Sequence, residues 1–313
     1  MAHIKPEKYI WLDGKLVPWN ESHVHFLTHS LHYGLAAFEG IRAYAQQTAP
    51  ASGAVFRLSE HTERLFASCK LCLIDVPYTR EQVNAACIET LQANGLHAAY
   101  LRPLVFLGDG SMGLGAMDPP VRVGVAAYVW GRYLGEDGVA NGIRAKISSF
   151  GRNNMAVGLP KGKICGQYVN SVLAKREVIK AGYDEAIMLD GQGQVAEATG
   201  ENIFAVIRGR LVTPPLSAAI LEGITRDSVL TLARDLGIPT CEEPIARDQL
   251  LLADEVFLTG TAAEVTPVRE IDDRAIGAGK PGPITKRIQQ TFFAATSGQL
   301  HPYSRWLTPV SPG

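Results

Sequence analysis

Three kinds of sequence feature are scarce in this chain, and each scarcity excludes a class of protein. The 313 residues include only five cysteines, an odd number that forms no disulfide framework, so a reducing cytoplasm is the simplest compartment. No apolar run is long enough to cross a bilayer, and the N-terminus lacks the apolar core of a secretory signal. The net charge of −1 gives no reason to expect nucleic acid or an anionic membrane as a partner.

What is abundant indicates a globular protein of more than one domain. Apolar residues make up 46% of the chain and charged residues 19%, which suits a sizeable core. Strand and helix patterns alternate in the first part, and a glycine-bearing stretch follows it. We therefore expect a small α+β domain over residues 1–130, an interdomain linker over 131–140 and a larger domain over 141–313.

Turn and capping signals predict several element boundaries. Asp13-Gly14 predicts a hairpin within residues 10–17. Thr79-Arg-Glu-Gln82 has capping-box spacing and opens a predicted helix that Gly95 should end. Ser59 is expected to cap an earlier helix that runs to about residue 72.

Three short segments suggest a particular chemistry. They are Lys163-Ile-Cys-Gly-Gln-Tyr168, Glu197-Ala-Thr-Gly-Glu-Asn202 and Gly223-Ile-Thr-Arg-Asp227. They supply an amine that can form a Schiff base, a carboxylate that can keep a pyridine nitrogen protonated, and a helix start that suits an anion. Those are the three needs of pyridoxal phosphate (PLP).

The order and spacing of these segments resemble the fold-type IV PLP enzymes, and most closely the branched-chain amino acid aminotransferases. The resemblance runs from about Tyr9 to about Gly298. It implies an α+β, two-domain fold of the D-amino acid aminotransferase-like kind. In that fold PLP lies between the domains and the larger one, residues 141–313, is the PLP-binding domain.

Two lysines compete for the covalent role. A lysine in a glycine-rich loop is usually just solvated, and the local pattern does not separate Lys161 from Lys163. The family pattern Lys-x-x-Gly-x-Tyr matches Lys163, Gly166 and Tyr168. Resemblance therefore makes Lys163 the Schiff-base lysine, and the base that moves a proton between the substrate Cα and the cofactor C4′. Cys165 departs from the family, which commonly has a glycine there.

The resemblance also implies the rest of the cofactor site. Glu197 would pair with the pyridine nitrogen, and Tyr168 would donate a hydrogen bond to the ring O3′. The plain alternative for Glu197 is a surface acid, and Glu201 is then the neighbouring candidate for the ring-nitrogen partner. The plain alternative for Tyr168 is ordinary core packing. The residues implied for the phosphate are Arg64, with Arg57 as its local competitor, Ile224 and Thr225 at a helix start, and Thr261. Thr225 could also be an N-cap and nothing more.

Further segments resemble the substrate pocket of the branched-chain transaminases. The residues implied are Tyr33, Phe38, Gly40, Arg42, Tyr100, Arg102, Met112, Leu114, Tyr133, Thr261 and Ala262. One site must accept an apolar branched side chain and, in the other half-reaction, glutamate. Phe38, Tyr33, Tyr133 and Leu114 could supply apolar walls, and Arg102 could meet the glutamate side-chain carboxylate. Plain core packing is the alternative for the aromatic residues.

Three other signals are set aside. Gly108-Asp-Gly110-Ser-Met-Gly113 matches a dinucleotide fingerprint, but the next predicted element is a strand where that motif needs a helix. The histidines at 23, 25, 29 and 32 lack a matching cysteine or carboxylate set, so we expect no metal. Cys69-Lys-Leu-Cys72 lies in a helical pattern, which favours core packing.

These observations predict a branched-chain amino acid transaminase. It would transfer the amino group of leucine, isoleucine or valine to 2-oxoglutarate in the cytoplasm, as a homodimer or a multimer of dimers, without nucleic acid or membrane. D-amino acid transaminase and an aminodeoxychorismate-lyase-like enzyme are alternatives of the same fold. An NAD-dependent oxidoreductase that uses the glycines of 108–113, and a catalytically inactive binding protein, are alternatives of other classes.

Overall fold

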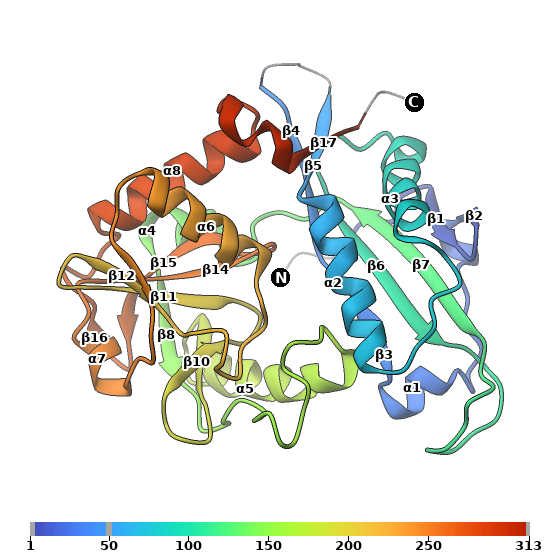
Figure 1. Cartoon of the computed structure of the whole chain (residues 1–313), viewed down its shortest axis with the longest axis horizontal. Helices are drawn as coiled ribbons and strands as arrows, with labels where there is room; N and C mark the ends of the chain where they lie inside the picture. Colours follow the sequence, from blue (N-terminus) through green and yellow to red (C-terminus); the bar gives the residue numbers. More distant parts are fainter. Residues whose placement is uncertain (1–3, 48–51, 311–313) are drawn as a thin grey trace. The chain divides into compact units, whose positions relative to one another are not determined.

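The computed structural model describes residues 4–47 and 52–310, which form two compact units (Figure 1). The first holds the described residues up to Trp130, the short segment Gly162–Gly166, and the described residues from Ala294 onward. The second holds Gly131–Lys161 and Gln167–Phe293. Each unit combines a sheet with helices, so the predicted α+β class is confirmed.

The first unit is built on an antiparallel sheet with the order β17-β5-β4-β6-β7-β1-β2, in which β3 also pairs with β6. Its strands are β1 (Tyr9–Leu12), β2 (Lys15–Pro18), β3 (Ala36–Phe38), β4 (Ile41–Ala45), β5 (Gly53–Phe56), β6 (Ala99–Leu107), β7 (Val121–Tyr128) and β17 (Leu307–Val310). Its helices are α1 (His29–Tyr33), α2 (Leu58–Leu71) and α3 (Arg80–Asn94). The predicted hairpin at Asp13-Gly14 joins β1 to β2.

Apolar stripes of α2 and α3 form the core of this unit with the sheet. Leu65 and Cys69 of α2 and Cys87 of α3 are at most 1% exposed and pack with strand residues such as Val105 and Val123. Cys69 and Cys72 are free thiols, and burial raises the pKa of both. Within residues 4–47 and 52–310, no three His, Cys, Asp or Glu side chains gather as a metal site would require.

One helix boundary was predicted well and one was not. The capping box of α3 is present, with Thr79 accepting from the Gln82 N–H at 3.3 Å, and Gly95 ends the helix in the left-handed region. The predicted Ser59 cap is wrong, because α2 begins at Leu58, so Ser59 lies inside the helix, and Arg57 precedes it at φ +51°. The Arg57 N–H donates to the Trp306 carbonyl at 2.6 Å, a contact 249 positions away in sequence (306 − 57) that no local pattern contains.

The second unit has a mixed sheet with the order β10-β9-β8-β15-β14-β11-β12-β13, and β16 pairs with β15. Its strands are β8 (Ile143–Ile147), β9 (Glu185–Leu189), β10 (Val195–Ala198), β11 (Asn202–Ile207), β12 (Arg210–Thr213), β13 (Thr240–Glu242), β14 (Glu255–Gly260), β15 (Glu264–Ile271) and β16 (Arg274–Ala275). Its helices are α4 (Gly135–Asn141), α5 (Tyr168–Lys180), α6 (Ile224–Asp235), α7 (Arg247–Leu251) and most of α8 (Pro283–Thr296). Helix α5 packs on β9 and α6 on β14.

The compact units differ from the predicted domain ranges in three places. The predicted linker, 131–140, contains most of helix α4. The last residues group with the first unit because β17 pairs with β5. The segment 162–166 also groups there, although residues on both sides belong to the second unit.

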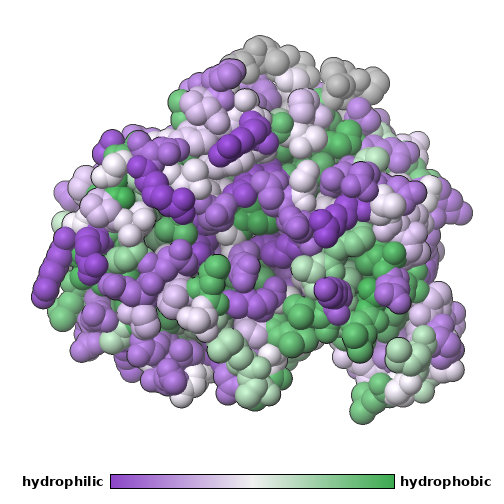
Figure 2. Space-filling view, viewed as in Figure 1, coloured by the Kyte–Doolittle hydropathy of each residue, from purple (hydrophilic) through white to green (hydrophobic). Residues whose placement is uncertain are grey.

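The visible surface is largely hydrophilic, with a cluster of apolar residues over the carboxyl-terminal end of α2 (Figure 2). Leu71 is 41% exposed and Leu73, which follows α2, is 82% exposed. None of the described helices is long and apolar enough to cross a bilayer. The chain from 108 to 120 contains no helix before β7 begins, so the context required for a dinucleotide-binding glycine motif is absent there.

Candidate active site

Lys163 lies in a short segment whose backbone is fixed to the first unit. Its N–H donates to Ser68 Oγ at 2.9 Å, and its carbonyl accepts from the Phe38 N–H at 3.1 Å. Three residues further on, the Gly166 N–H donates to the Gly34 carbonyl at 2.9 Å. The Lys163 Nζ lies 5.0 Å from the centre of the Phe38 ring. The segment is therefore held at both ends, with its amine beside an aromatic face.

Lys161 is held in a different way. Its Nζ donates to three backbone carbonyls of the second unit, those of Leu216, Ala218 (3.2 Å) and Ile220 (3.1 Å). An ammonium has three protons to donate, so each of them has an acceptor. Burial lowers the pKa of Lys161. Its side chain thus serves as a tether for the segment 216–220.

Arg64 forms a two-point contact with a buried carboxylate that no sequence motif indicates. Glu39 is completely buried and accepts from Arg64 Nε at 2.7 Å, from Arg64 Nη2 at 2.9 Å and from His61 Nδ1 at 2.8 Å. Burial opposes the charge, but Arg64 and His61 hold the pKa of Glu39 well below its usual range. Burial lowers the pKa of His61, which favours its neutral form. The competitor Arg57 instead pairs with Glu60 at 2.7 Å.

Several predicted substrate residues of the first unit surround Phe38. The Arg102 Cζ lies 4.9 Å from the Phe38 ring centre and 5.5 Å from that of Tyr100. A Cβ on Gly40 would fall 1.8 Å from the Tyr100 hydroxyl, so any larger residue there would have to displace the Tyr100 side chain. Arg42 is the register partner of Tyr100 across β4 and β6.

The other predicted substrate residues of this unit lie on α1 and on the 108–120 loop. Tyr33 is 41% exposed and its ring is 4.6 Å from that of His29. His29 Nε2 is 3.0 Å from the Gly113 carbonyl, which ties the loop to α1. Met112 is 40% and Leu114 is 90% exposed. They therefore form a second, exposed group on the first unit.

In the second unit, the carboxylate of Glu197 on β10 is buried among hydrogen-bond donors. Oε1 accepts from Arg152 Nη2 at 2.7 Å. Oε2 accepts from Asn202 Nδ2 at 3.1 Å and from the Leu221 N–H at 3.1 Å. All three groups can only donate to it, so the surroundings favour the ionised carboxylate.

The start of α6 lies against the same cluster. Gly223 precedes the helix in an extended conformation and has no side chain to cap it. A Cβ at Gly223 would come within 1.9 Å of Asn202 Oδ1, so the asparagine beside Glu197 also requires a glycine at the helix start. Thr225 is 3% and Ile224 is 8% exposed. Asn202 thus links the predicted ring-nitrogen partner to the predicted phosphate site.

The remaining predicted residues of this unit lie at the ends of elements. Thr261 and Ala262 follow β14, and the Ala262 carbonyl is 3.5 Å from the Tyr133 N–H. Tyr133 also faces the ammonium of Lys175, with 4.9 Å from Nζ to the ring centre. Tyr168 is the first residue of α5.

Glu201, the alternative acid, has different surroundings from Glu197. Its carboxyl is buried, and burial together with the nearby Glu185 raises the pKa of Glu201 to about 8. This shift favours its protonated form, which is a poor partner for a cationic ring. Glu197, with a guanidinium contact at 2.7 Å, suits that role better.

Glu39, Asn202 and Arg152 contact predicted site residues and are absent from the set predicted from the sequence. Asn202 ends the segment that suggested Glu197, and Glu39 lies between two predicted residues, Phe38 and Gly40. Arg152 lies in a polar loop with no periodic or motif signal. Only the contact of Arg152 with β10 reveals it.

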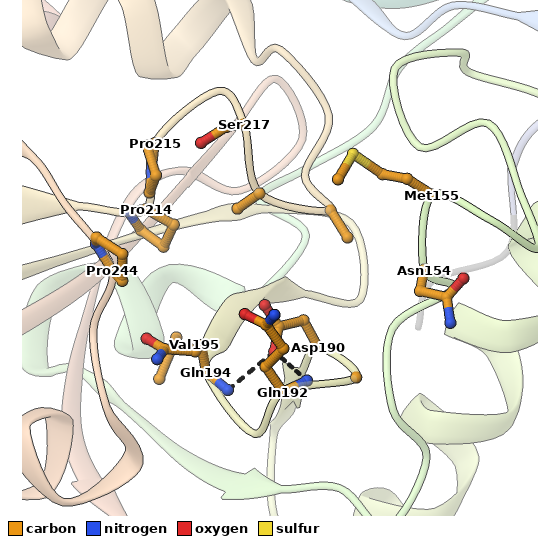
Figure 3. Close-up of a pocket in the computed structure, with 13 residues that line it drawn as sticks. Asn154, Met155, Asp190, Gln192, Gln194, Val195, Pro214, Pro215, Ser217 and Pro244 are labelled. Atoms are coloured by element: carbon orange, nitrogen blue, oxygen red, sulfur yellow. Dashed lines mark hydrogen bonds between the residues drawn. The ribbon is translucent and has the colours of Figure 1, made fainter.

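A pocket of the second unit is lined by residues other than these (Figure 3). Asp190 accepts from the N–H groups of Gln192 and Gln194 at 2.9 Å each, and Pro214, Pro215 and Pro244 form another part of the wall. Among its described lining residues are none that the sequence predicts for cofactor or substrate. Its wall includes Ala218, whose carbonyl accepts a hydrogen bond from Lys161 Nζ.

Comparison with known proteins identifies the family. The model of the amino-transferase class IV family matches residues 36–271. A branched-chain-amino-acid aminotransferase of Pseudomonas aeruginosa is 46% identical over 301 residues, which is 96% of this chain and 97% of the relative. The chain belongs to the class IV aminotransferases, in their branched-chain-amino-acid family.

Solved structures of that family have the same fold as this class IV chain. The branched-chain amino acid aminotransferase of Escherichia coli is 42% identical, with a TM-score of 0.94 over 97% of this chain and 100% of that one. The enzyme of Thermobaculum terrenum in its PLP form is 35% identical, with a TM-score of 0.91 over 98% and 99% of the two chains. Class IV aminotransferases depend on PLP.

The donors in the second unit fit this cofactor. A carboxylate that accepts from Arg152, Asn202 and the Leu221 N–H suits a protonated pyridine nitrogen. The glycine-started α6, 12 residues long, suits a phosphate.

Proposed function

We propose that this aminotransferase transfers the amino group of L-leucine, L-isoleucine or L-valine to 2-oxoglutarate, giving the branched 2-oxo acid and glutamate. The observation that carries the proposal is the near full-length similarity to the P. aeruginosa enzyme. The segment from Lys163 to Tyr168 supports it, because its backbone is anchored and its amine is beside Phe38.

The roles follow from what each side chain can do. Bound PLP supplies an electron sink for the carbanion that forms at the substrate Cα. Lys163 would hold the cofactor covalently and, once displaced by substrate, move a proton between Cα and C4′. Glu197 would keep the ring nitrogen protonated, and Tyr168 would donate to the ring O3′.

The phosphate would be bound by backbone and charge together. The N–H groups of Ile224 and Thr225 begin α6, where the helix dipole favours an anion. Thr261 would donate its hydroxyl, and Arg64 would supply the positive charge. The bidentate contact with Glu39 fixes the direction of the Arg64 fork.

Substrate recognition would use an apolar wall and one cation. Phe38 and Tyr133 would contact a branched side chain, and Gly40 and Tyr100 would shape the wall. Arg102 would pair with the side-chain carboxylate of glutamate. Arg42, Met112 and Ala262 complete the proposed set.

Exposed apolar residues on the first unit support a homodimer. Phe26 is 79%, Leu31 64%, Leu114 90% and Met117 84% exposed, all on or near α1 and the 108–120 loop. A second copy that covers this group would place Tyr33 and Leu114 in contact with the partner subunit. Light scattering after size exclusion tests this: a monomer at micromolar concentration contradicts it. The free cysteines suit the cytoplasm, which we propose as the compartment.

A panel of amino donors in both enantiomers, with 2-oxoglutarate and pyruvate as acceptors, tests the substrate assignment. We expect the three branched L-amino acids and L-glutamate to be the best donors, with kcat/KM at least tenfold above alanine. Preference for D-alanine would indicate a D-amino acid transaminase. Pyruvate release from an aminodeoxychorismate-type substrate would indicate the lyase.

A further inference from the structure

Arg152 connects Glu197 to helix α5, which begins with Tyr168. Glu197 and Tyr168 are both predicted to contact the pyridine ring of PLP. Arg152 Nη2 contacts Glu197 Oε1 at 2.7 Å, and its Nη1 donates to Ser171 Oγ at 3.0 Å in the first turn of α5. Its backbone N–H donates to the Leu189 carbonyl of β9 at 2.7 Å. The side chain of Arg152 is 11% exposed and that of Glu197 is 5% exposed. The pair is thus fixed to two elements and largely removed from water.

Arg152 places a positive charge against a buried carboxyl group. A carboxylate in a poorly solvated site takes up a proton unless opposite charge and hydrogen bonds compensate it. Arg152 supplies a cation in direct contact with Glu197, whereas Asn202 and the Leu221 N–H are neutral donors. Lys161 and Glu201 also interact electrostatically with the Glu197 carboxylate. Where a carboxylate faces a pyridine nitrogen, one proton can lie on either group. A guanidinium beside the carboxylate makes that carboxylate a weaker base, which leaves the proton on the nitrogen.

We propose that Arg152 is a positioning residue of the transamination: it fixes Glu197 in place and keeps it ionised, so that the ring nitrogen of the bound cofactor stays protonated. The inference rests on the proposed function. It adds that the strength of the electron sink depends on a residue that need not touch the cofactor. It also predicts that removing the charge has a different effect from removing Glu197 itself, because the carboxyl remains but becomes protonated.

The test compares Arg152→Met, Arg152→Lys and a matched control, Arg144→Met, as full-length holoenzymes. Arg144 lies in the same unit and contacts Glu270 at 2.7 Å with a more exposed side chain, so its variant loses an ion pair remote from Glu197. The direct readout is the ¹⁵N chemical shift of PLP labelled at the ring nitrogen, measured against pH. The second readout is the pH profile of kcat for L-leucine, with KM taken separately.

In the wild type and in Arg144→Met the ring nitrogen should be protonated across pH 6–9. In Arg152→Met it should lose that proton or share it with Glu197. The acid limb of the kcat profile should move up by about 1–3 pH units, as expected when a cation within a few ångström of a carboxylate is removed. At pH 7 kcat should fall about 10- to 100-fold with KM changed less than threefold, and Arg152→Lys should lie between.

An unchanged nitrogen shift and an unchanged acid limb in Arg152→Met overturn the inference. If that variant does not fold, Arg152→Gln, which keeps a donor but lacks the charge, replaces it and the same outcomes decide. The proposed function fails separately: the wild type would then bind no PLP covalently or would not transaminate leucine. A wild type that transaminates while all the Arg152 variants titrate like it contradicts only the inference.

Discussion

At the scale of single residues, the two lysines of the 161–163 segment differ in what their side chains contact. Lys161 is saturated by three backbone carbonyls, whereas the Lys163 amine lies beside the Phe38 ring. We expect Lys163→Ala to abolish transamination. Lys161→Ala should retain the covalent cofactor and lose about 0.5–1.5 kcal/mol of stability, because partly exposed carbonyls lose their donor.

Borohydride reduction followed by peptide mapping checks this assignment. The phosphopyridoxyl label should appear on the peptide that contains Lys163 in the wild type and in Lys161→Ala. A label on Lys161, or on neither lysine, would reassign the covalent residue.

Arg102 should affect one half-reaction more than the other. Leucine lacks the side-chain carboxylate that Arg102 is proposed to bind, and a charge-assisted hydrogen bond contributes about 1.5–3 kcal/mol. Arg102→Leu should therefore lower kcat/KM for glutamate roughly 10- to 100-fold and that for leucine much less. Stopped-flow measurement of the two half-reactions separates them. Equal losses would mean that Arg102 acts on the shared α-carboxylate or on the packing of Phe38 and Tyr100.

Candidate site residues could be proposed from the sequence where a short motif contains them. Lys163, Tyr168 and Glu197 lie in contiguous segments with family spacing, and the roles implied for them remain proposals. Arg152 and Glu39 escaped notice because their importance lies in contacts across 45 and 25 positions, 197 − 152 and 64 − 39. Side-chain pairing at such separations leaves no local pattern.

At the scale of elements, boundaries were predictable where the cap is local. Thr79 and Gly95 bound α3 as the capping box and the glycine indicated. The start of α2 was missed because the Trp306 carbonyl, far along the chain, fixes Arg57 in the left-handed region. A residue distant in sequence also caps helix α8, and we expect its removal to lower the stability of the protein measurably.

Helix α8 is capped by Glu255 of β14. Its carboxylate, on a residue 7% exposed, accepts from the Ile284 N–H at 3.1 Å and the Thr285 N–H at 2.7 Å. Glu255→Ala should cost about 0.5–2 kcal/mol, the range for losing an N-terminal cap. The control is Glu63→Ala, which removes an exposed 3.5 Å contact with Arg80 and should cost under about 1 kcal/mol. Equal urea midpoints for the two variants would contradict the capping role of Glu255.

At the scale of the whole molecule, the two-unit division depends on pairings that the sequence does not display. β17 pairs with β5 across some 250 positions, and the segment that holds Lys163 groups with the first unit while its neighbours belong to the second. The α+β class was predictable because periodicity and turn signals are local. Which strands pair, and where the units divide, depends on long-range packing.

The stability of the whole chain should depend on pH through Glu201. Its pKa of about 8 in the folded protein exceeds the ordinary 4.5, so the folded form binds the proton more tightly. Its contribution is therefore fully present below pH 4.5 and is lost as the pH rises to about 8. Glu201→Gln removes this dependence. The free energy of unfolding of the variant should therefore increase relative to that of the wild type as the pH rises from 5 to 8. Urea unfolding at pH 5.5, 7 and 8.5 measures it, and parallel curves would contradict the buried, protonated state.

The central claim is that this class IV aminotransferase transfers nitrogen from a branched-chain amino acid to 2-oxoglutarate. The most direct test incubates the purified holoenzyme with ¹⁵N-labelled L-leucine and 2-oxoglutarate and follows the label by mass spectrometry. We expect ¹⁵N to appear in L-glutamate, one for each 4-methyl-2-oxopentanoate formed, and the Lys163→Ala variant to transfer none. Label released as ammonia, or glutamate that stays unlabelled while leucine is consumed, would contradict it.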